Sequence, residues 1–307
     1  MKYRIIIVLV LIMFSCRNQK PSDNTNIEVN KIESLLNLFR TPSKDYILIG
    51  AHRGDWRNSP ENSLQAIRNC IKMGIDLVEI DVRKTKDGEL VVFHDETLDR
   101  MTDSSGEVKD FLLDSLVKIP LLNGIGQETK FTIPTLKEAL EEAKGKILVK
   151  LDKCYDHIPQ AYSIVKDLEM QNQVIFITTK TYSDSKKDYG TTIDEILLMP
   201  AFNCTSLEDV PSFVQGHIDN NDPVAFEIGF DSEDCPSINA FDQIKENQHA
   251  ICVDVLWASL CAGHDDNLAV EDPEGSWGWV IERGANILIT DRPRDLLEYL
   301  KSKNLHN

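Results

Sequence analysis

Short apolar runs recur along the chain and alternate with segments of helical periodicity. Apolar runs of strand length separated by helical segments are typical of a parallel α/β architecture. The predicted strands are residues 46–51, 77–82, 90–94, 147–152, 174–178, 196–199, 224–228, 251–256 and 286–290. Helical patterns lie between many of them, for example at 63–73, 135–144, 160–169 and 291–301.

One of these nine strands is surplus to a (β/α)8 barrel, which needs eight. Asp87-Gly88, between 77–82 and 90–94, is a strong hairpin signal. We therefore predict an α/β fold, a (β/α)8 TIM barrel somewhat distorted near its second and third strands. An open doubly wound sheet is the alternative, but no glycine-rich strand-to-helix turn supports it. The less regular residues 97–131 are predicted to be a small insertion after the third strand, over the pocket.

The first residues predict export. Lys2 and Arg4 precede an apolar run that is too short to span a bilayer and resembles a signal peptide. Ser15-Cys16 resembles a bacterial lipoprotein cleavage site, so residues 1–16 are predicted to be a signal peptide that ends at a lipidated Cys16. Residues 17–30 are polar and predict a flexible tether, with the barrel domain at 31–307. The predicted protein is a membrane-anchored lipoprotein facing the periplasm.

The composition narrows the possible partners. A net charge of −17 argues against nucleic acid, whose backbone needs a basic surface. The six cysteines after Cys16 form no C-x-x-C pair, which argues against a zinc site. Their pairing and the oligomeric state stay open.

Candidate chemistry gathers where two predicted strands meet. Glu79 and Asp81 are two residues apart on a strand and therefore share a face, within reach of one cation. His94 ends the next apolar run, and His52 ends the first strand, directly before Arg53. Histidines can transfer protons near neutral pH, and the Arg53 guanidinium suits phosphate oxygens. The alternative for the two carboxylates is the solvent face of an amphipathic strand.

Several short motifs carry a resemblance that spans roughly residues 46–296. These motifs are His52-Arg53-Gly54, Pro60-Glu61-Asn62-Ser63, Glu79-Ile80-Asp81, Asp87-Gly88, His94-Asp95, Ile133-Pro134-Thr135-Leu136 and Thr290-Asp291-Arg292-Pro293. With the motifs in this order, the chain resembles the glycerophosphodiester phosphodiesterases, a (β/α)8-barrel family of metal-dependent phosphohydrolases.

The resemblance implies roles for individual residues. It assigns Glu79 and Asp81 to a divalent cation, His52 and His94 to general base and acid catalysis, and Arg53 to the phosphate. All-oxygen ligation favours Mg²⁺ or Ca²⁺ without choosing between them.

Two regions depart from the family pattern. The family usually has Glu-x-Lys on its fourth strand, where this chain reads Leu148-Val-Lys150-Leu-Asp152-Lys153, so Asp152 is taken as the third metal ligand. Whether Lys150 or Lys153 reaches the phosphate stays open, and both can also be surface charges.

The second departure concerns the head group. Where the family often has Trp-Thr-Val-Asn, the chain reads Ile251-Cys-Val-Asp254-Val-Leu-Trp257, and Asp254 and Trp257 are taken as substrate-binding residues. His264, with the acidic residues after it, either contacts a hydroxylated head group or forms a solvated loop.

The predicted function is metal-dependent hydrolysis of glycerophosphodiesters to glycerol 3-phosphate and an alcohol. A substrate hydroxyl can attack phosphorus and give a cyclic phosphate, or water can attack directly. The same chemistry on lysophospholipids, glycerophosphoinositol or sugar phosphodiesters is an alternative. A lipoprotein that binds phosphorylated ligands without catalysis is another, but it does not account for an intact histidine pair beside the acids.

Overall fold

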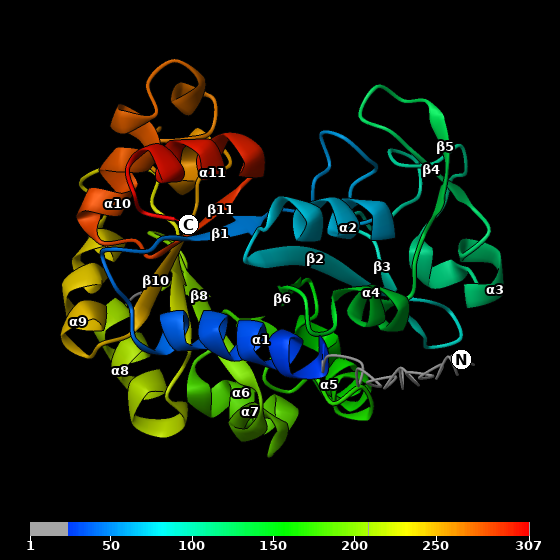
Figure 1. Ribbon diagram of the computed structural model, residues 1–307. Helices are drawn as coiled ribbons and strands as arrows, with labels where there is room; N and C mark the ends of the chain where they lie inside the picture. The colour runs from blue at the N-terminus through cyan, green and yellow to red at the C-terminus, as the bar shows by residue number, and fades with distance from the viewer. Residues whose placement is uncertain (1–23, 208, 307) are drawn as a thin grey trace, which may run out of the picture.

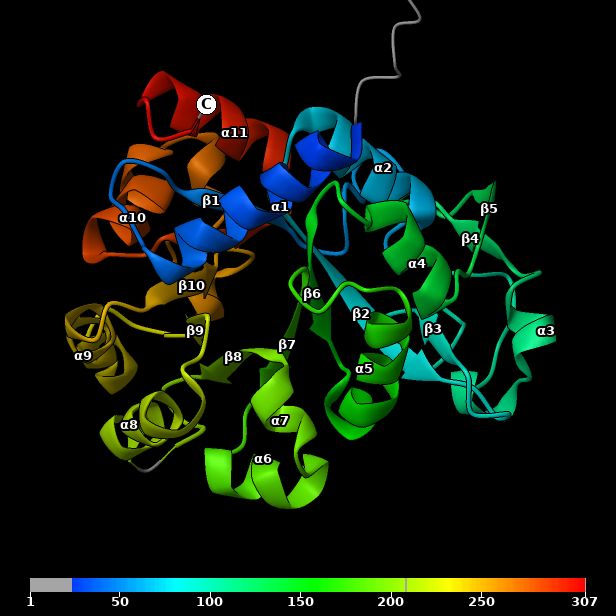
Figure 2. The same ribbon diagram turned by 60° about the horizontal axis from the view of Figure 1, so that its bottom comes forward.

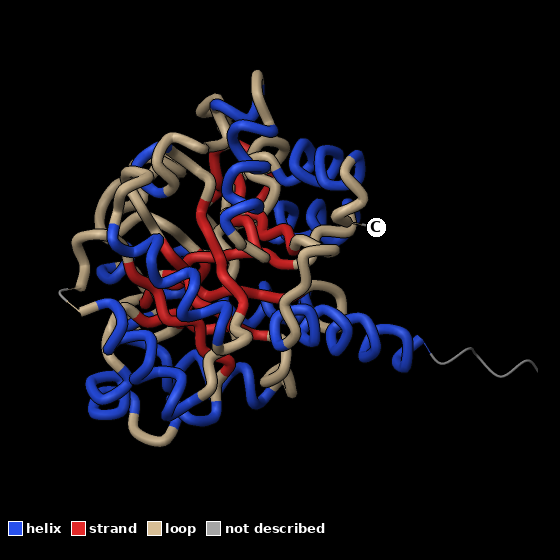
Figure 3. Tube along the Cα trace, turned by 90° about the vertical axis from the view of Figure 1, so that its left-hand side faces the viewer, coloured by secondary structure: helices blue, strands red, loops and turns tan. Residues whose placement is uncertain are grey.

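Eight parallel strands close into a barrel in the computed structural model, which describes residues 24–207 and 209–306. β1 pairs with both β11 and β2, and this double pairing closes the ring. Figure 3 shows the strands gathered at the centre with helices around them. The predicted TIM barrel is thus confirmed. Its strands are β1 (Leu48–Ala51), β2 (Leu77–Lys84), β6 (Leu148–Asp152), β7 (Val174–Thr178), β8 (Leu197–Phe202), β9 (Ala225–Ile228), β10 (Ala250–Asp254) and β11 (Ile287–Thr290).

The predicted strand at residues 90–94 is the one that does not belong to the eight-stranded barrel. β3 (Leu90–Val92) runs antiparallel to β2, with Val82 opposite Val92. The turn between them contains Gly88 at φ 89°, in the left-handed region that glycine adopts without strain. The predicted distortion near the second and third strands is therefore this hairpin.

Helices cover the outside of the barrel (Figure 1). α2 follows the sequence pattern closely: the Ser63 side chain accepts from the Ala66 backbone at its start, and Gly74 ends it at φ 84°. The short α7 and the π-helix Glu274–Gly278 are additional turns in the connections. The α-helices of this layer are α2 (Leu64–Met73), α4 (Leu136–Ala143), α5 (Ile158–Asp167), α6 (Tyr182–Tyr189), α7 (Thr192–Glu195), α8 (Val210–Asn221), α9 (Ala240–Glu246), α10 (Trp279–Arg283) and α11 (Pro293–Ser302).

α1 (Asn24–Arg40) corrects the predicted tether. The helix begins inside the stretch 17–30, and residues 17–23 lie outside the described residues. Its buried side chains recur at helical spacing and pack on residues at the beginnings of the strands, including Leu48, Leu77 and Leu148. Figure 2 shows α1 next to β1. The helix thus covers the N-terminal end of the barrel, opposite the C-terminal ends of the strands. The buried side chains are Ile32, Leu35, Leu36 and Phe39.

Residues after β3 form the predicted insertion beside the barrel. It contains α3 (Leu113–Leu116) and a hairpin of β4 (Pro120–Leu122) and β5 (Glu128–Thr132), which lie together in Figure 1. A separate apolar cluster that includes Phe93, Leu98 and Leu121 holds it against β3. The sequence pattern missed this hairpin because β5 lies on the surface and alternates between exposed and half-buried positions.

One bond between loops is relevant to the predicted export. Cys204 and Cys235 form a disulfide that joins the loops after β8 and β9. Cys16 lies outside the described residues. Within the described ranges, the helices are too short or too polar to cross a membrane.

Candidate active site

Three carboxylates meet at the C-terminal ends of β2 and β6. Glu79 and Asp81 share one face of β2, and the strand register places Asp81 beside Asp152, the last residue of β6. One oxygen from each lies within 4.8 Å of the others. The first two residues are almost completely buried, whereas Asp152 is partly exposed. The structure therefore brings all three predicted metal ligands together.

The cluster fits a hard divalent cation. Glu79 Oε1 is buried and has no hydrogen-bond partner, which leaves a ligand position open. Burial and the nearby Asp81 raise the pKa of Glu79 to about 8, so the ion-free site is short of positive charge. Three carboxylates are a donor set that suits Mg²⁺ or Ca²⁺.

Backbone turns orient these carboxylates. Arg53 and Asn62 both adopt left-handed φ angles, of 52° and 58°. The Arg53 backbone N–H thereby donates to Glu79 Oε2 at 2.8 Å. The Asn62 amide donates to Asp81 Oδ2 at 2.8 Å, and its oxygen accepts from the Asp81 backbone at 3.0 Å. Asn62 therefore supports a predicted metal ligand, and the neighbouring Ser63 caps the helix.

His52 lies at the end of β1 and is held by Asp291. Its Nδ1 lies 2.8 Å from Asp291 Oδ1, which also accepts from the Trp56 indole at 2.6 Å. Burial lowers the pKa of His52, but the Asp291 hydrogen bond and the charges of Glu79 and Asp291 outweigh burial and raise it. Asp266 in turn accepts from the Asp291 backbone at 2.6 Å.

His94 faces the opposite balance of charges. Its Nδ1 lies 2.5 Å from Asp95, which Arg100 holds through a second ion pair. Burial lowers the pKa of His94, and the positive charges of Arg53 and Lys153 add to this effect. The pKa of His94 thus falls while that of His52 rises, so near neutral pH one imidazole tends to be neutral and the other protonated.

The Arg53 side chain lies among the acidic groups of the site. Its guanidinium lies 3.1 Å from Glu61 and 3.6 Å from Asp81. Its Nε is buried without a hydrogen-bond partner. Arg53 thus keeps donor capacity beside the carboxylates and both histidines, as a phosphate contact requires.

The two candidate lysines occupy different places. Lys150 is 2% exposed inside the barrel, where it forms an ion pair with Glu227. Lys153 is partly exposed at φ 52°, directly after Asp152, and close enough to His94 to lower its pKa. Lys153 thus lies beside His94 and a metal carboxylate, whereas Lys150 is held inside the barrel by Glu227.

Asp254 and Trp257 lie at the end of β10. Asp254 Oδ1 lies 3.8 Å from Lys150 Nζ. Trp257 is 45% exposed, and its ring lies edge-on to His52 with centroids 6.0 Å apart. Both residues therefore lie beside other candidate site residues, at the end of the strand whose sequence departs from the family pattern.

The loop at His264 is not a solvated acidic loop, because Asp265 and Asp266 are buried. His264 Nδ1 lies 2.6 Å from the Gly275 carbonyl oxygen, and its ring stacks on Trp279. Asp266 is buried beneath Asp291, and burial raises its pKa to about 6. The loop thus holds the backbone of Asp291, the residue that holds His52.

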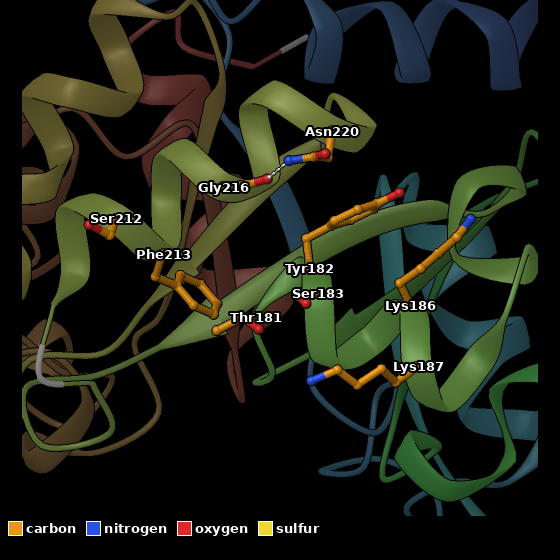
Figure 4. Close-up of a pocket in the computed structure, with 9 residues that line it drawn as sticks. All are labelled: Thr181, Tyr182, Ser183, Lys186, Lys187, Ser212, Phe213, Gly216 and Asn220. Atoms are coloured by element: carbon orange, nitrogen blue, oxygen red, sulfur yellow. Dashed lines mark hydrogen bonds between the residues drawn. The ribbon is translucent and has the colours of Figure 1, made fainter.

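A separate surface groove lies between α6 and α8 (Figure 4). It encloses about 500 Å³ and is lined by side chains such as Tyr182, Lys186 and Phe213. None of the predicted site residues lines this groove.

Comparison with known proteins finds a family model that matches the first half of the barrel. Residues 52–195 match the model of the glycerophosphoryl diester phosphodiesterase family, over the segment that carries both histidines and all three carboxylates. This segment, slightly less than half of the chain, is therefore similar to that family.

Relatives support the assignment over part of the chain. A glycerophosphodiester phosphodiesterase from Caldanaerobacter subterraneus is 48% identical over 152 residues, which are 46% of this chain and 62% of the relative. Human glycerophosphodiester phosphodiesterase 1 is 35% identical over 134 residues, 42% of this chain and 40% of that protein. The chain thus matches less than two thirds of the length of these relatives.

Solved structures extend the likeness to nearly the whole fold. A glycerophosphoryl diester phosphodiesterase from Parabacteroides distasonis has a TM-score of 0.72 at 24% identity, over 89% of this chain and 92% of that chain. An Oleispira antarctica phosphodiesterase in complex with the product sn-glycerol-3-phosphate has a TM-score of 0.59 at 21% identity, over 83% and 96% of the two chains. At these identities the likeness concerns the fold.

The second half of the barrel differs from the first. Residues 198–300 match another family model, described as a domain of unknown function. Asp254 and Trp257 lie in this half, as does Glu227, which sequence reasoning missed. The division between the two models falls between α7 and β8.

Proposed function

We propose that the protein is a divalent-metal-dependent phosphodiesterase that hydrolyses glycerophosphodiesters to glycerol 3-phosphate and an alcohol. The convergence of Glu79, Asp81 and Asp152 between two histidines carries this proposal. The match of residues 52–195 to the family model and the product complex of the Oleispira structure support it.

The residues divide the work by charge and by proton affinity. A cation held by the three carboxylates would neutralise the diester and polarise its phosphoryl oxygens. Arg53 and Lys153 bind the remaining phosphate oxygens and orient phosphorus toward the histidines. The directions of the two pKa shifts reverse the base and acid roles that the resemblance implies for the histidines. His94, with the lowered pKa, accepts the proton of the attacking hydroxyl. His52, with the raised pKa, donates a proton to the leaving alkoxide.

Asp291 and Asp95 are positioning residues in this scheme. Each holds the Nδ1 of one histidine, so that Nε2 is left for the substrate. We also propose, from the leader pattern, that the enzyme is anchored through Cys16 and faces the periplasm. The disulfide between Cys204 and Cys235 supports export, since such bonds persist in oxidising compartments.

Phosphorus NMR tests the reaction. Glycerophosphodiesters incubated with the protein and Mg²⁺ or Ca²⁺ are expected to yield glycerol 3-phosphate, directly or after a transient cyclic phosphate signal. EDTA, Glu79→Gln and His52→Ala are each expected to abolish the product signal. Absence of product from every diester, with the wild-type protein folded and a divalent ion supplied, would overturn the proposed function.

A further inference from the structure

A cavity of about 620 Å³ lies at the N-terminal end of the barrel. Its wall comes from the loop between α1 and β1 and from the ends of α9 and α10, and Figure 1 shows these segments together. Ile47, His249 and Asn286 line it, and each lies directly before a barrel strand. This basal cavity is therefore on the face opposite to the carboxylate cluster, which lies at the C-terminal ends of the strands.

The charges on the wall of the basal cavity are mostly positive, in a chain whose net charge is −17. Four basic side chains line it, and one acid, Glu282, is among the described lining residues. Four positive charges and one negative charge leave a net charge of +3 on the wall. Such a surface attracts anions, and it does so against the overall charge of the protein. The basic residues are Arg40, Lys44, Lys245 and Arg283.

Two of these cations are held by residues that do not line the cavity. Lys245 Nζ lies 2.9 Å from Asp242 Oδ1, and it donates to the Arg283 carbonyl oxygen at 3.4 Å. The Arg283 guanidinium lies over the Trp279 ring, 4.1 Å from its centroid, and 3.7 Å from Glu233 Oε2. The two acids compensate part of the positive charge, and these contacts fix both cations on the wall.

Arg40 and Lys44 carry the uncompensated charge. Both are exposed, and neither side chain has an ion-pair or hydrogen-bond partner among residues 24–207 and 209–306. The loop that carries Lys44 is fixed to the barrel, because the Asn286 amide donates to the Ser43 carbonyl oxygen at 3.3 Å. Two free cations therefore lie at a fixed place beside the cavity.

His249 adds a polar atom that lacks a hydrogen bond. The residue is only 9% exposed, and its Nδ1 lies 2.9 Å from the Pro223 carbonyl oxygen. This contact requires a proton on Nδ1, so Nε2 is left for another partner. The Asp222 carboxylate is 3.7 Å from Nε2, which is beyond hydrogen-bond distance. A buried imidazole on the cavity wall thus keeps one nitrogen for a ligand oxygen.

The size and the remaining wall of the basal cavity suit an organic anion. Its volume of about 620 Å³ falls within the roughly 300–1,000 Å³ of small-molecule sites. The guanidinium of Arg40 matches two phosphate oxygens, and the Lys44 ammonium adds a second positive charge. Apolar side chains offer contacts to the carbon atoms of such a ligand, and they are Pro42, Ile47, Ile281 and Ala285.

We propose that the basal cavity binds the phosphate group of an organic phosphate, either a soluble phosphate ester or an anionic phospholipid head group. Arg40 and Lys44 contact the phosphate, and His249 Nε2 contacts an oxygen of the same ligand. The inference goes beyond the proposed function and does not depend on it, because none of the candidate catalytic residues lines this cavity.

Calorimetry of the metal-free full chain, without a chelator, tests the site with three probes. Phenyl phosphate represents a soluble ester, and dihexanoylphosphatidylglycerol below its micelle concentration represents an anionic head group. Dihexanoylphosphatidylcholine has the same acyl chains and no net charge. The double variant Arg40→Gln, Lys44→Gln is expected to bind the anionic probes about tenfold more weakly than wild type, the loss of about 1.4 kcal/mol of charge pairing.

The matched control is the double variant Lys118→Gln, Lys301→Gln, which removes the same charge from exposed residues outside the cavity. Lys301 lies in the last turn of α11, as Arg40 does in α1. Its affinities should equal those of wild type. Both double variants should keep the wild-type rate of glycerol 3-phosphate release, so the outcome is separate from that of the proposed function.

Binding of phenyl phosphate alone would identify a soluble ligand, and binding of phosphatidylglycerol alone would identify a lipid head group. Either result, or binding of both, supports the site if the Arg40 and Lys44 variant weakens it. Equal affinities of the two double variants would overturn the inference. So would phosphatidylcholine binding as tight as that of phosphatidylglycerol, or no binding of any probe.

Discussion

Asp291 sets the proton affinity of His52 through a direct hydrogen bond and a negative charge. Asp291→Ala removes both contributions, so the pKa of His52 should fall. The protonated imidazole is then lost at a lower pH, and the alkaline limb of the kcat/KM profile should move toward acid. We expect activity at pH 7.5 to fall about 10- to 100-fold, within the range of general acid catalysis.

The matched control is Asp295→Ala, on α11, whose carboxylate pairs with Arg292 outside the site. Its profile should overlay that of the wild type. A uniform loss of activity in Asp291→Ala, with both limbs in place, would contradict the positioning role and leave only a structural one.

Lys150 has a structural role inside the barrel that its sequence position did not suggest. Lys150→Met leaves Glu227 and Asp254 facing each other without a cation. Breaking a buried ion pair by removing one partner costs about 3–5 kcal/mol, which urea denaturation would detect. Adding Glu227→Gln should recover part of the loss. Lys146→Met, on a partly exposed lysine whose ion pair lies on the surface, should change stability by less than about 0.5 kcal/mol. An unchanged stability in Lys150→Met would contradict the interior ion pair.

At the scale of elements, the disulfide joins the loops after β8 and β9. Cys204 and Cys235 are separated by 31 residues, and a closed loop of that length lowers the entropy of the unfolded chain. The double serine variant should therefore lose about 3–4 kcal/mol of unfolding free energy in urea. Wild-type protein in reductant should lose the same amount. Equal stability of oxidised and reduced protein would show that the bond does not form.

The strands were predictable because each is a local apolar run, and all nine predicted strands are present. The hairpin of β2 and β3 was predictable for the same reason, from Asp87-Gly88. α1 and the hairpin of β4 and β5 were not. α1 begins in a polar stretch, and its apolar face is buried by contact with strand residues that are distant in the sequence.

The residues of the site also divide into those that the sequence predicts and those that it does not. Glu79 and Asp81 are two apart on one strand, so their shared face follows from strand geometry. Glu227 and the role of Asp291 depend on contacts between strands far apart in the chain. A single sequence gives no local signal for such pairs.

For the whole molecule, the carboxylate cluster links stability to pH and to the divalent ion. The pKa of Glu79 in the folded, ion-free protein is about 8, above its usual value of 4.5. An acid with a raised folded pKa contributes stability below its unfolded pKa and loses it as pH rises through the folded value. Thermal unfolding in EDTA should therefore show a Tm that falls between pH 5 and 8.

A bound cation compensates the same charges, so the increase in Tm produced by Mg²⁺ or Ca²⁺ should grow across this pH range. Glu79→Gln lacks the titrating group, and its Tm in EDTA should vary less with pH. A cation-induced shift that is absent, or that shrinks as pH rises, would contradict the linkage.

The central claim is that Glu79, Asp81 and Asp152 hold the cation on which hydrolysis depends. The most direct measurement is the initial rate of glycerol 3-phosphate release as a function of free divalent-ion concentration, for wild type and Asp152→Asn. Wild type should show saturable activation from a rate near zero in EDTA. Asp152→Asn should need at least about tenfold more ion for half-maximal rate, since it loses one charged ligand. A rate independent of the ion, or identical midpoints for the two proteins, would contradict the account.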